Sequence, residues 1–347
     1  MENVVYNVRG KGKKMRERNQ CQILWRKNQR CMGEILRVYA SGGIIEIPGT
    51  LQGVQVDAIA PYCFSSARHI PEGNHSLTWG EKEFAGENQD GLFGELKEFS
   101  GNLVEEVVLP DTLTEIGASA FYNCKKLRRL TFGPSLRGVG SDAFMNAQDF
   151  HEIILTCGPG DKTGLKQILA QISSDMEVKF QGKEGRKAVL VYPEYYESYD
   201  EIAPAHLFGR SITGEGFRAR QGFREGCVDF AAYDGVFSQA CVEESEQTLM
   251  KMALNRLMYP FALGEVSALL YREYLMGHIT NLTRDKIEKR ELKTLVFLCE
   301  QGLLSGRELK QAARYASELG WAEGTAKLME FHSGEKDAWD EYEFEEF

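Results

Sequence analysis

The fold is decided by residues 104–155, which read VEEVVLPDTLTEIGASAFYNCKKLRRLTFGPSLRGVGSDAFMNAQDFHEIIL. One pattern of apolar residues fills this stretch twice and begins a third time, each time 23 positions later. The matched positions are Val104/Leu127, Val107/Leu130, Leu109/Phe132, Leu113/Leu136, Ile116/Val139, Gly117/Gly140, Ala120/Ala143 and Phe121/Phe144, followed by Phe150, Ile153 and Leu155. A fixed period of this size indicates a repeat protein, in which each unit buries its apolar face against its neighbours.

An earlier and more divergent unit begins at Ile44. The residues that match the later units are Ile45, Ile47, Pro48, Leu51, Ile59 and Phe64. Residues 65–102 then lose the pattern, and we interpret them as a degenerate repeat or a decorated loop. The layer position of Cys124 is taken by Ala147 in the next unit, so Cys124 is predicted to be a buried packing thiol.

The repeats resemble a known family at the strings LPDTLTEIGASAFYNCKKL (109–127) and SLRGVGSDAFMNAQDF (135–150). They are similar to the BspA-type bacterial leucine-rich repeat, whose pattern is LP-x-x-L-x-x-IG-x-x-AF-x-x-C-x-x-L. The resemblance covers about residues 44–156. It implies a short solenoid of stacked parallel strands that serves as a protein-binding or adhesion surface. Members studied as adhesins are secreted, and no signal peptide is recognisable here, so the adhesin role is not carried over.

The strand positions that alternate with the core residues are predicted to face outward. At the 23-residue offset they form two rows, which we predict to be the partner-binding residues: Glu106, Arg129 and Glu152 in one, and Val108, Thr131 and Ile154 in the other. The first row is a ladder of alternating charge. The second is an exposed apolar stripe, which is either covered by another part of the chain or offered to a partner.

Composition excludes several classes of protein. The chain has 347 residues, 43% of them hydrophobic and 27% charged, which is ordinary for a globular protein. A net charge of -10 argues against a general nucleic-acid or membrane binder, and no window is long and apolar enough to span a bilayer. The eight cysteines show no metal-ligand spacing. We therefore expect a cytoplasmic location, no metal, no cofactor and no catalytic residues.

Residues 176–246 are predicted to be a mixed α/β segment, with strands at 176–180 and 188–192. A further strand is predicted over 217–224, which would place Arg218, Arg220 and Arg224 on one face. Three guanidinium groups on one face could hold an anion or an acidic peptide. The alternative is that Glu225, Asp229 and Asp234 neutralise them. The chain's own acidic end, residues 337–347, is one candidate for such a peptide.

From residue 247 onward, apolar residues recur at helical spacing. Cys299–Gly302 and Phe331–Gly334 are predicted to close two helices 32 positions apart, which weakly resembles ankyrin-like helical hairpins. The predicted architecture is thus an α/β repeat: a short leucine-rich-repeat solenoid, a mixed α/β segment and an α-helical C-terminal domain. The predicted parts are a basic segment 1–43, a solenoid with capping helix 44–175, the mixed segment 176–246, helices 247–334 and an acidic tail 335–347.

The sequence favours a non-enzymatic scaffold that binds a protein partner through the sheet face of the solenoid. Two alternatives remain open. A hydrolase-type enzyme could have its site within 176–260, with Cys227 as nucleophile and His206 as base, although nothing in the sequence places the two together. A secreted cell-surface adhesin is the other alternative.

Overall fold

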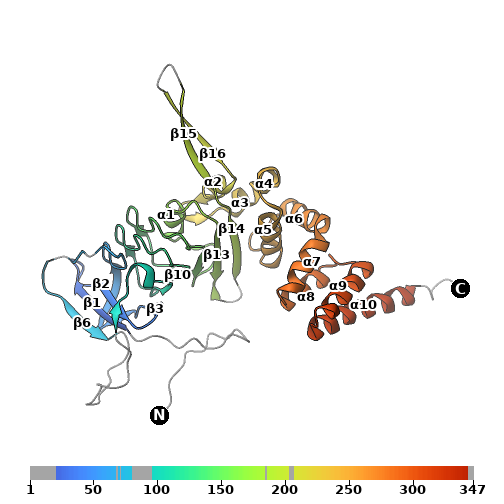
Figure 1. The fold of residues 1–347 in the computed structure, drawn as a ribbon, viewed down its shortest axis with the longest axis horizontal. Helices are drawn as coiled ribbons and strands as arrows, with labels where there is room; N and C mark the ends of the chain where they lie inside the picture. The colour runs from blue at the N-terminus through green and yellow to red at the C-terminus, as the bar shows by residue number, and fades with distance from the viewer. Residues whose placement is uncertain are drawn as a thin grey trace, which may run out of the picture. The chain divides into compact units, whose positions relative to one another are not determined.

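The computed structural model describes residues 21–67, 69–70, 72–79, 96–183, 186–202 and 207–342 (Figure 1). The chain divides into two compact units, Met1–Phe150 and His151–Phe347. The repeats of the first unit and the helices of the second confirm the predicted fold class. The finer division into five parts remains a prediction.

In the first unit, each repeat contributes one strand to a parallel sheet. The strands are β3 (Ile44–Glu46), β8 (Glu106–Val108) and β10 (Arg129–Phe132). Ile45 is paired with Val107, and Val107 with Leu130, which is the register that the sequence pattern predicts. The early unit at residues 44–64 therefore stacks directly on the repeat at residue 104, although 39 residues separate Phe64 from Val104 in the sequence.

A second parallel ladder is built from the second half of each repeat. It contains β5 (Val54–Ile59), β9 (Glu115–Ile116) and β11 (Gly138–Val139), with Ile59 opposite Ile116 and Ile116 opposite Val139. The short β4 (Thr50–Leu51) pairs with β5. Two such ladders, each advancing one strand per repeat, make the solenoid that the period predicts.

Between the two ladders, one aromatic side chain from each layer stacks on the next. The ring centroids of Phe64 and Phe121 lie 4.7 Å apart, those of Phe121 and Phe144 5.2 Å apart, and those of Phe144 and Phe150 5.2 Å apart. The spacing matches the distance between neighbouring strands, about 4.8 Å. Cys124 is buried beside this column, as predicted, and burial raises the pKa of its thiol to about 12.

Gly117 and Gly140 are required by the close approach of successive layers. A Cβ at Gly117 would lie 2.4 Å from the backbone nitrogen of Pro61, and one at Gly140 would lie 2.3 Å from that of Ala118. Neither glycine has a positive φ. The glycines are therefore fixed by packing between layers.

The start of the described chain forms part of a sheet. β1 (Cys21–Lys27) pairs with β2 (Gly33–Ala40) on one side and β6 (Ser76–Trp79) on the other. β2 pairs with β5 and with β7 (Lys97–Glu98). Strands from the unpatterned stretch 65–102 thus extend the sheet that contains β5. The described parts of this stretch favour a decorated insertion, and the 3-10 turn η1 (Gly101–Leu103) lies at its end.

A buried arginine holds the start of that insertion. Arg37 on β2 is fully buried and donates to the carbonyl oxygens of Cys63, Ser65 and Ala67 at 2.7–3.1 Å. Its guanidinium also lies 3.2 Å from a carboxylate oxygen of Glu98 on β7. One side chain therefore ties the last turn of the early repeat to the two strands beside it.

The second unit begins with three neighbouring strands of a sheet. β12 (Glu152–Leu155) is parallel to β13 (Met176–Gln181), which is antiparallel to β14 (Lys187–Tyr192). The short helix α1 (Leu165–Leu169) connects β12 to β13. Next come the hairpin of β15 (Tyr196–Ile202) and β16 (Leu207–Thr213), helix α2 (Gly216–Ala219) and the pair β17 (Phe223–Arg224) and β18 (Cys227–Val228).

The rest of the second unit is helical, as predicted. The helices are α3 (Phe230–Gly235), α4 (Phe237–Glu243), α5 (Glu246–Met258), α6 (Glu265–Gly277), α7 (Ile279–Glu288), α8 (Leu292–Glu300), α9 (Gly306–Glu318) and α10 (Ala322–Tyr342). Gly302 and Gly320 follow α8 and α9 with positive φ, as expected of residues that end helices. Gly334 does not end a helix, because α10 continues to Tyr342, into the segment predicted as an acidic tail.

A buried ion pair joins three of these helices. Asp234 on α3 accepts two hydrogen bonds from the guanidinium of Arg256 on α5, at 2.7 and 2.8 Å. The hydroxyl of Tyr271 on α6 donates to the same carboxylate at 2.8 Å. All three residues are at most 3% exposed. Asp234 is thus committed to Arg256 and does not neutralise the arginines at 218–224.

The layer contact at Gly140 leads to a first prediction. Gly140→Ala should lower the free energy of unfolding of the chain by about 1–3 kcal/mol, because the added methyl group has to displace the backbone of Ala118. Urea unfolding followed by circular dichroism measures this. Gly277→Ala makes the same chemical change at the open end of α6, where a Cβ would have no neighbour within 4 Å, and should be neutral. Equal effects of the two changes would contradict the packing argument.

Candidate functional site

The sheet face of the first unit carries a cluster of four charged residues from β8, β10 and the residues just before them. Arg129 lies 2.9 Å from Glu106 on the neighbouring strand, and Arg128 lies 2.6 Å from Glu105. A longer contact of 3.8 Å joins Arg128 to Glu106. In each pair the arginine and the glutamate lie one strand spacing apart, because the parallel register places them side by side. The predicted charge ladder is therefore present between β8 and β10.

The predicted outward rows are less open than the sequence indicates. Glu106 is 8% exposed and Thr131 9%, whereas Val108 and Arg129 are half-buried. Of the two alternatives for the apolar row, burial of Thr131 agrees with a covered position and not with one open to a partner. A residue on an inner strand is shielded by the side chains on both neighbouring strands. Arg128 is the most exposed charged residue of this cluster, with 46% of its side chain exposed.

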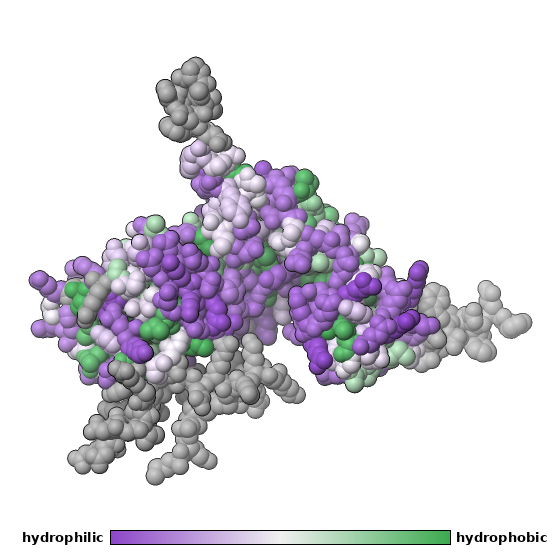
Figure 2. Space-filling model, viewed as in Figure 1, coloured by the Kyte–Doolittle hydropathy of each residue, from purple (hydrophilic) through white to green (hydrophobic). Residues whose placement is uncertain are grey.

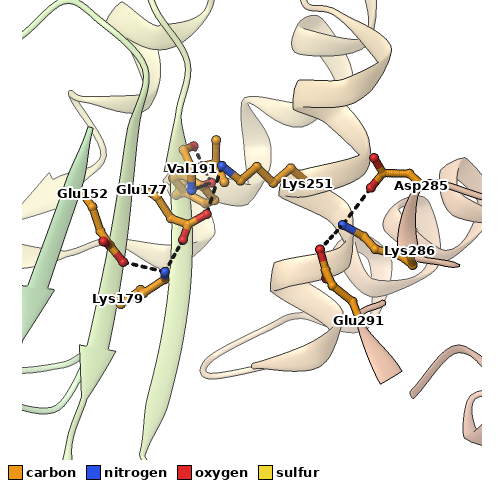
Figure 3. A network of polar contacts seen from close by, with 9 residues as sticks. Glu152, Glu177, Lys179, Val191, Lys251, Asp285, Lys286 and Glu291 are labelled. Atoms are coloured by element: carbon orange, nitrogen blue, oxygen red, sulfur yellow. Dashed lines mark hydrogen bonds and ion pairs between the residues drawn. The ribbon is translucent and has the colours of Figure 1, made fainter. Parts of the chain in front are cut away.

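In the second unit, the predicted outward residue Glu152 takes part in a chain of ion pairs (Figure 3). The amino group of Lys179 on β13 lies 2.7 Å from Glu152 on β12 and 2.6 Å from Glu177. Glu177 in turn lies 3.0 Å from Lys251 on α5. Glu152 is buried and Ile154, the last predicted partner-binding residue, is half-buried. This network ties the sheet to α5 and leaves little of Glu152 for a partner.

The same contacts shift the proton affinities of the network. Burial alone would raise the pKa of Glu177, but its hydrogen bonds to Lys179 and the positive charge of Lys251 outweigh burial and lower that pKa. For Lys179, burial would lower the pKa, and the hydrogen bonds to Glu152 and Glu177 raise it instead. Glu177 and Lys179 are therefore both charged near neutral pH. A second cluster in Figure 3 places Lys286 between Asp285 and Glu291, at 3.0 and 3.2 Å.

The predicted anion site at Arg218, Arg220 and Arg224 does not form, and the strand predicted over 217–224 is wrong. Helix α2 occupies its first half, because Gly216 starts a helical turn. Arg220 is buried and donates to the carbonyl oxygens of Pro193, Gly216 and Ser174 at 2.5–3.0 Å. Its guanidinium is therefore occupied by backbone.

The two other arginines have separate acidic partners. Arg218 lies 3.4 Å from Glu215, and Arg224 lies 3.0 Å from Asp229. Asp229 was one of the residues expected to neutralise the arginines, and this part of the alternative interpretation is confirmed. Because the three guanidinium groups do not converge, the hypothesis that the acidic end of the chain binds them loses its basis.

No alternative chemistry gains support from the described part of the chain. Cys227 is half-buried on β18, while His206, its hypothetical base, lies outside the described residues. Within the described ranges, no group of three or more histidine, cysteine, aspartate or glutamate residues could hold a metal ion. No helix among those residues combines the length and the apolar character needed to cross a membrane.

The sequence analysis missed a groove between α7 and α9, with a volume of about 340 Å³. Its signal was visible in the apolar residues Ile279, Leu282 and Ile287, which follow helical spacing but were not assigned to a helix of their own. On the face shown in Figure 2, hydrophilic residues predominate and the hydrophobic ones form small scattered groups.

Comparison with known proteins identifies the repeats. Residues 95–167 match the model of the family described as BspA type Leucine rich repeat region (6 copies). This segment is similar to BspA-type leucine-rich repeats. The match confirms the resemblance inferred from residues 109–150, and it covers the BspA-type strands β8, β9, β10, β11 and β12. The ankyrin-like character of the C-terminal helices remains a prediction. A search of curated proteins finds no match.

Two solved structures are similar to parts of the chain. One is a leucine-rich cell surface protein from Faecalibacterium prausnitzii, with 22% identity, a TM-score of 0.25 and coverage of 38% of this chain. The chain spans only about 30% of that protein's length. The other is a leucine-rich repeat protein from T. pallidum, with 14% identity and a TM-score of 0.22, covering 40% of this chain and 72% of that one.

The Glu177 network yields a second prediction. Since the folded pKa of Glu177 is below its usual 4.5, its contribution to stability is present above that pH and is lost as the pH falls through the lowered value. Glu177→Gln should therefore cost about 1 kcal/mol of unfolding free energy at neutral pH, and the difference from the unaltered chain should shrink at about pH 3.5. Urea unfolding at both pH values measures this.

The matched control is Glu300→Gln, which removes an exposed carboxylate at the end of α8. This change should alter stability little at either pH. A cost for Glu177→Gln that stays constant between the two pH values would show that the side chain acts through packing and not through its charge.

Proposed function

We propose that this chain is a protein-binding scaffold that presents the sheet face of its BspA-type repeats to a partner protein. Leucine-rich repeats suggest protein interaction in general. The observation that supports the specific surface is the four-residue cluster of Glu105, Glu106, Arg128 and Arg129. It holds two negative and two positive groups at fixed spacing on a rigid sheet.

The cluster is rigid, and this rigidity favours binding of a partner. The backbones of β8 and β10 are held by parallel pairing, and the residues beneath them, such as Val107 and Leu130, are fully buried. A partner with complementary charges therefore meets groups that are already ordered, and little entropy is lost on binding. Opposite charges arranged in this way favour one orientation of the partner and disfavour others.

Several properties of the scaffold stay predictions. They are the cytoplasmic location, the absence of enzymatic activity, and the lack of nucleic-acid or membrane partners. The net charge of -10 supports the last of these, because polyanionic partners favour a basic surface. The partner itself is a protein whose binding face carries acidic and basic groups in a complementary order.

The third prediction concerns Arg128, which is a better probe than the half-buried Arg129. Arg128→Glu should weaken binding of a partner purified from the native cell by about three- to tenfold, because the change breaks the pair with Glu105 and reverses an exposed charge. Lys126→Glu makes the same charge change at a nearby exposed position outside the cluster and should have less effect. Titration calorimetry with the purified partner compares the two variants.

An exchange of the two charges separates recognition from stability. The double variant Glu105→Arg with Arg128→Glu restores the attraction within the pair but reverses its polarity. Thermal stability should return to that of the unaltered chain while binding stays weak. Recovery of binding together with stability would mean that no partner reads the polarity of this pair, and the proposed surface would have to be abandoned.

A further inference from the structure

The groove between α7 and α9 combines an apolar floor with polar groups that the fold leaves unused. Its floor contains Ile279 and Ile287 from α7, Leu304 from the turn before α9, and Ala312 from α9. All four are buried, at 1–5% exposure. The volume of about 340 Å³ lies near the lower end of the range for ligand pockets, about 300–1,000 Å³.

A hydroxyl group in this groove has no partner in the described part of the protein. Thr283 lines the groove and is 5% exposed, and its Oγ1 is buried without a hydrogen bond. A buried polar group without a partner costs about 1–3 kcal/mol. A threonine within a helix can satisfy its hydroxyl on the carbonyl four residues earlier, but this one does not do so. Its position therefore suits a ligand that brings a hydrogen-bonding group.

The next residue on α7, Arg284, also lines the groove. Arg284 is exposed at the rim, and no carboxylate of the described residues lies within ion-pair distance of it. Its guanidinium carbon lies 5.6 Å from the centroid of the Tyr315 ring. The Tyr315 hydroxyl instead donates to Glu288 at 2.6 Å, which leaves the ring face available to the guanidinium.

The acidic residues of the rim are already used. Glu308 accepts a hydrogen bond from the backbone nitrogen of Ser305 at 2.7 Å, as part of the capping box of α9. Glu318 lies 2.9 Å from Arg314. A single guanidinium without an ion-pair partner cannot neutralise the several charges of a polyanion such as a nucleotide. The arrangement suits one carboxylate joined to an apolar group.

We propose that this groove binds a segment of a partner protein in which an apolar side chain lies next to a carboxylate. The apolar side chain occupies the floor, the carboxylate pairs with Arg284, and the segment supplies a hydrogen-bonding group to Thr283. This site lies within the second unit and is independent of the repeat surface proposed above. Either one can fail without affecting the other.

The fourth prediction uses a defined probe, a short synthetic peptide in which leucine alternates with glutamate. Fluorescence anisotropy of the labelled peptide measures its affinity for the full chain, and methyl NMR shifts of Ile279, Ile287 and Leu304 report binding in the groove. Arg284→Glu should weaken binding by about tenfold, the effect of losing a charged hydrogen-bonding partner and reversing its charge. Arg307→Glu reverses an exposed charge on α9 outside the groove and is the matched control.

Thr283→Val distinguishes a binding role from a structural one. The substitution keeps the shape but removes the unpartnered hydroxyl, so the chain should become more stable in urea unfolding while the peptide binds more weakly. A residue needed only for folding would lose stability instead.

Three results would overturn the proposal. The first is equal weakening by Arg284→Glu and Arg307→Glu, which would indicate general electrostatic attraction. The second is unchanged binding when glutamine replaces glutamate in the peptide, which would remove the role of the carboxylate. The third is the absence of methyl shifts in the groove when the peptide is added.

Discussion

Backbone hydrogen bonds between successive layers fix the spacing on which the rest of the first unit depends. Leu109 donates to the carbonyl of Thr131 at 2.8 Å, and Phe121 donates to that of Ala143 at 2.8 Å. Because the layers advance by one strand spacing, each phenylalanine meets the phenylalanine of the next layer, and no side chain fits at Gly140. The apolar period, the aromatic column and the invariant register are consequences of this one constraint.

The second unit is held together in a different way. There, buried charges join elements that no repeat relates to one another, as the contacts of Asp234 with Arg256 and Tyr271 show. Arg220 has the same role with backbone carbonyls as its partners. Buried ion pairs of this kind can contribute little net stability, but removing one partner is costly because a charge is left uncompensated in the interior. They therefore help to specify one arrangement of the helices.

The same reasoning separates structural charges from charges offered to a partner. Glu152, Glu177 and Lys179 satisfy one another and tie the sheet to α5. In contrast, Arg284 and the hydroxyl of Thr283 have apolar or aromatic neighbours and no polar partner among the described residues. The exposed Arg128 lies between these cases, since it is paired but remains accessible. The proposed repeat surface is thus inferred from an accessible ion pair, and the proposed groove from polar groups without a polar partner.

The sequence by itself determined the solenoid, because a 23-residue period of apolar residues can be buried only by stacking, and it gave the register of Ile45, Val107 and Leu130 correctly. Only the tertiary structure decided which polar residues are available to bind a partner. The three arginines at 218, 220 and 224 do not share one face, because α2 replaces the expected strand. Arg220 is buried against backbone carbonyls, whereas Arg218 and Arg224 form separate ion pairs. The groove at Thr283 likewise arises from two helices whose contact no local pattern specifies. Burial of a side chain depends on its neighbours in space, which periodicity predicts within a repeat but not beyond it.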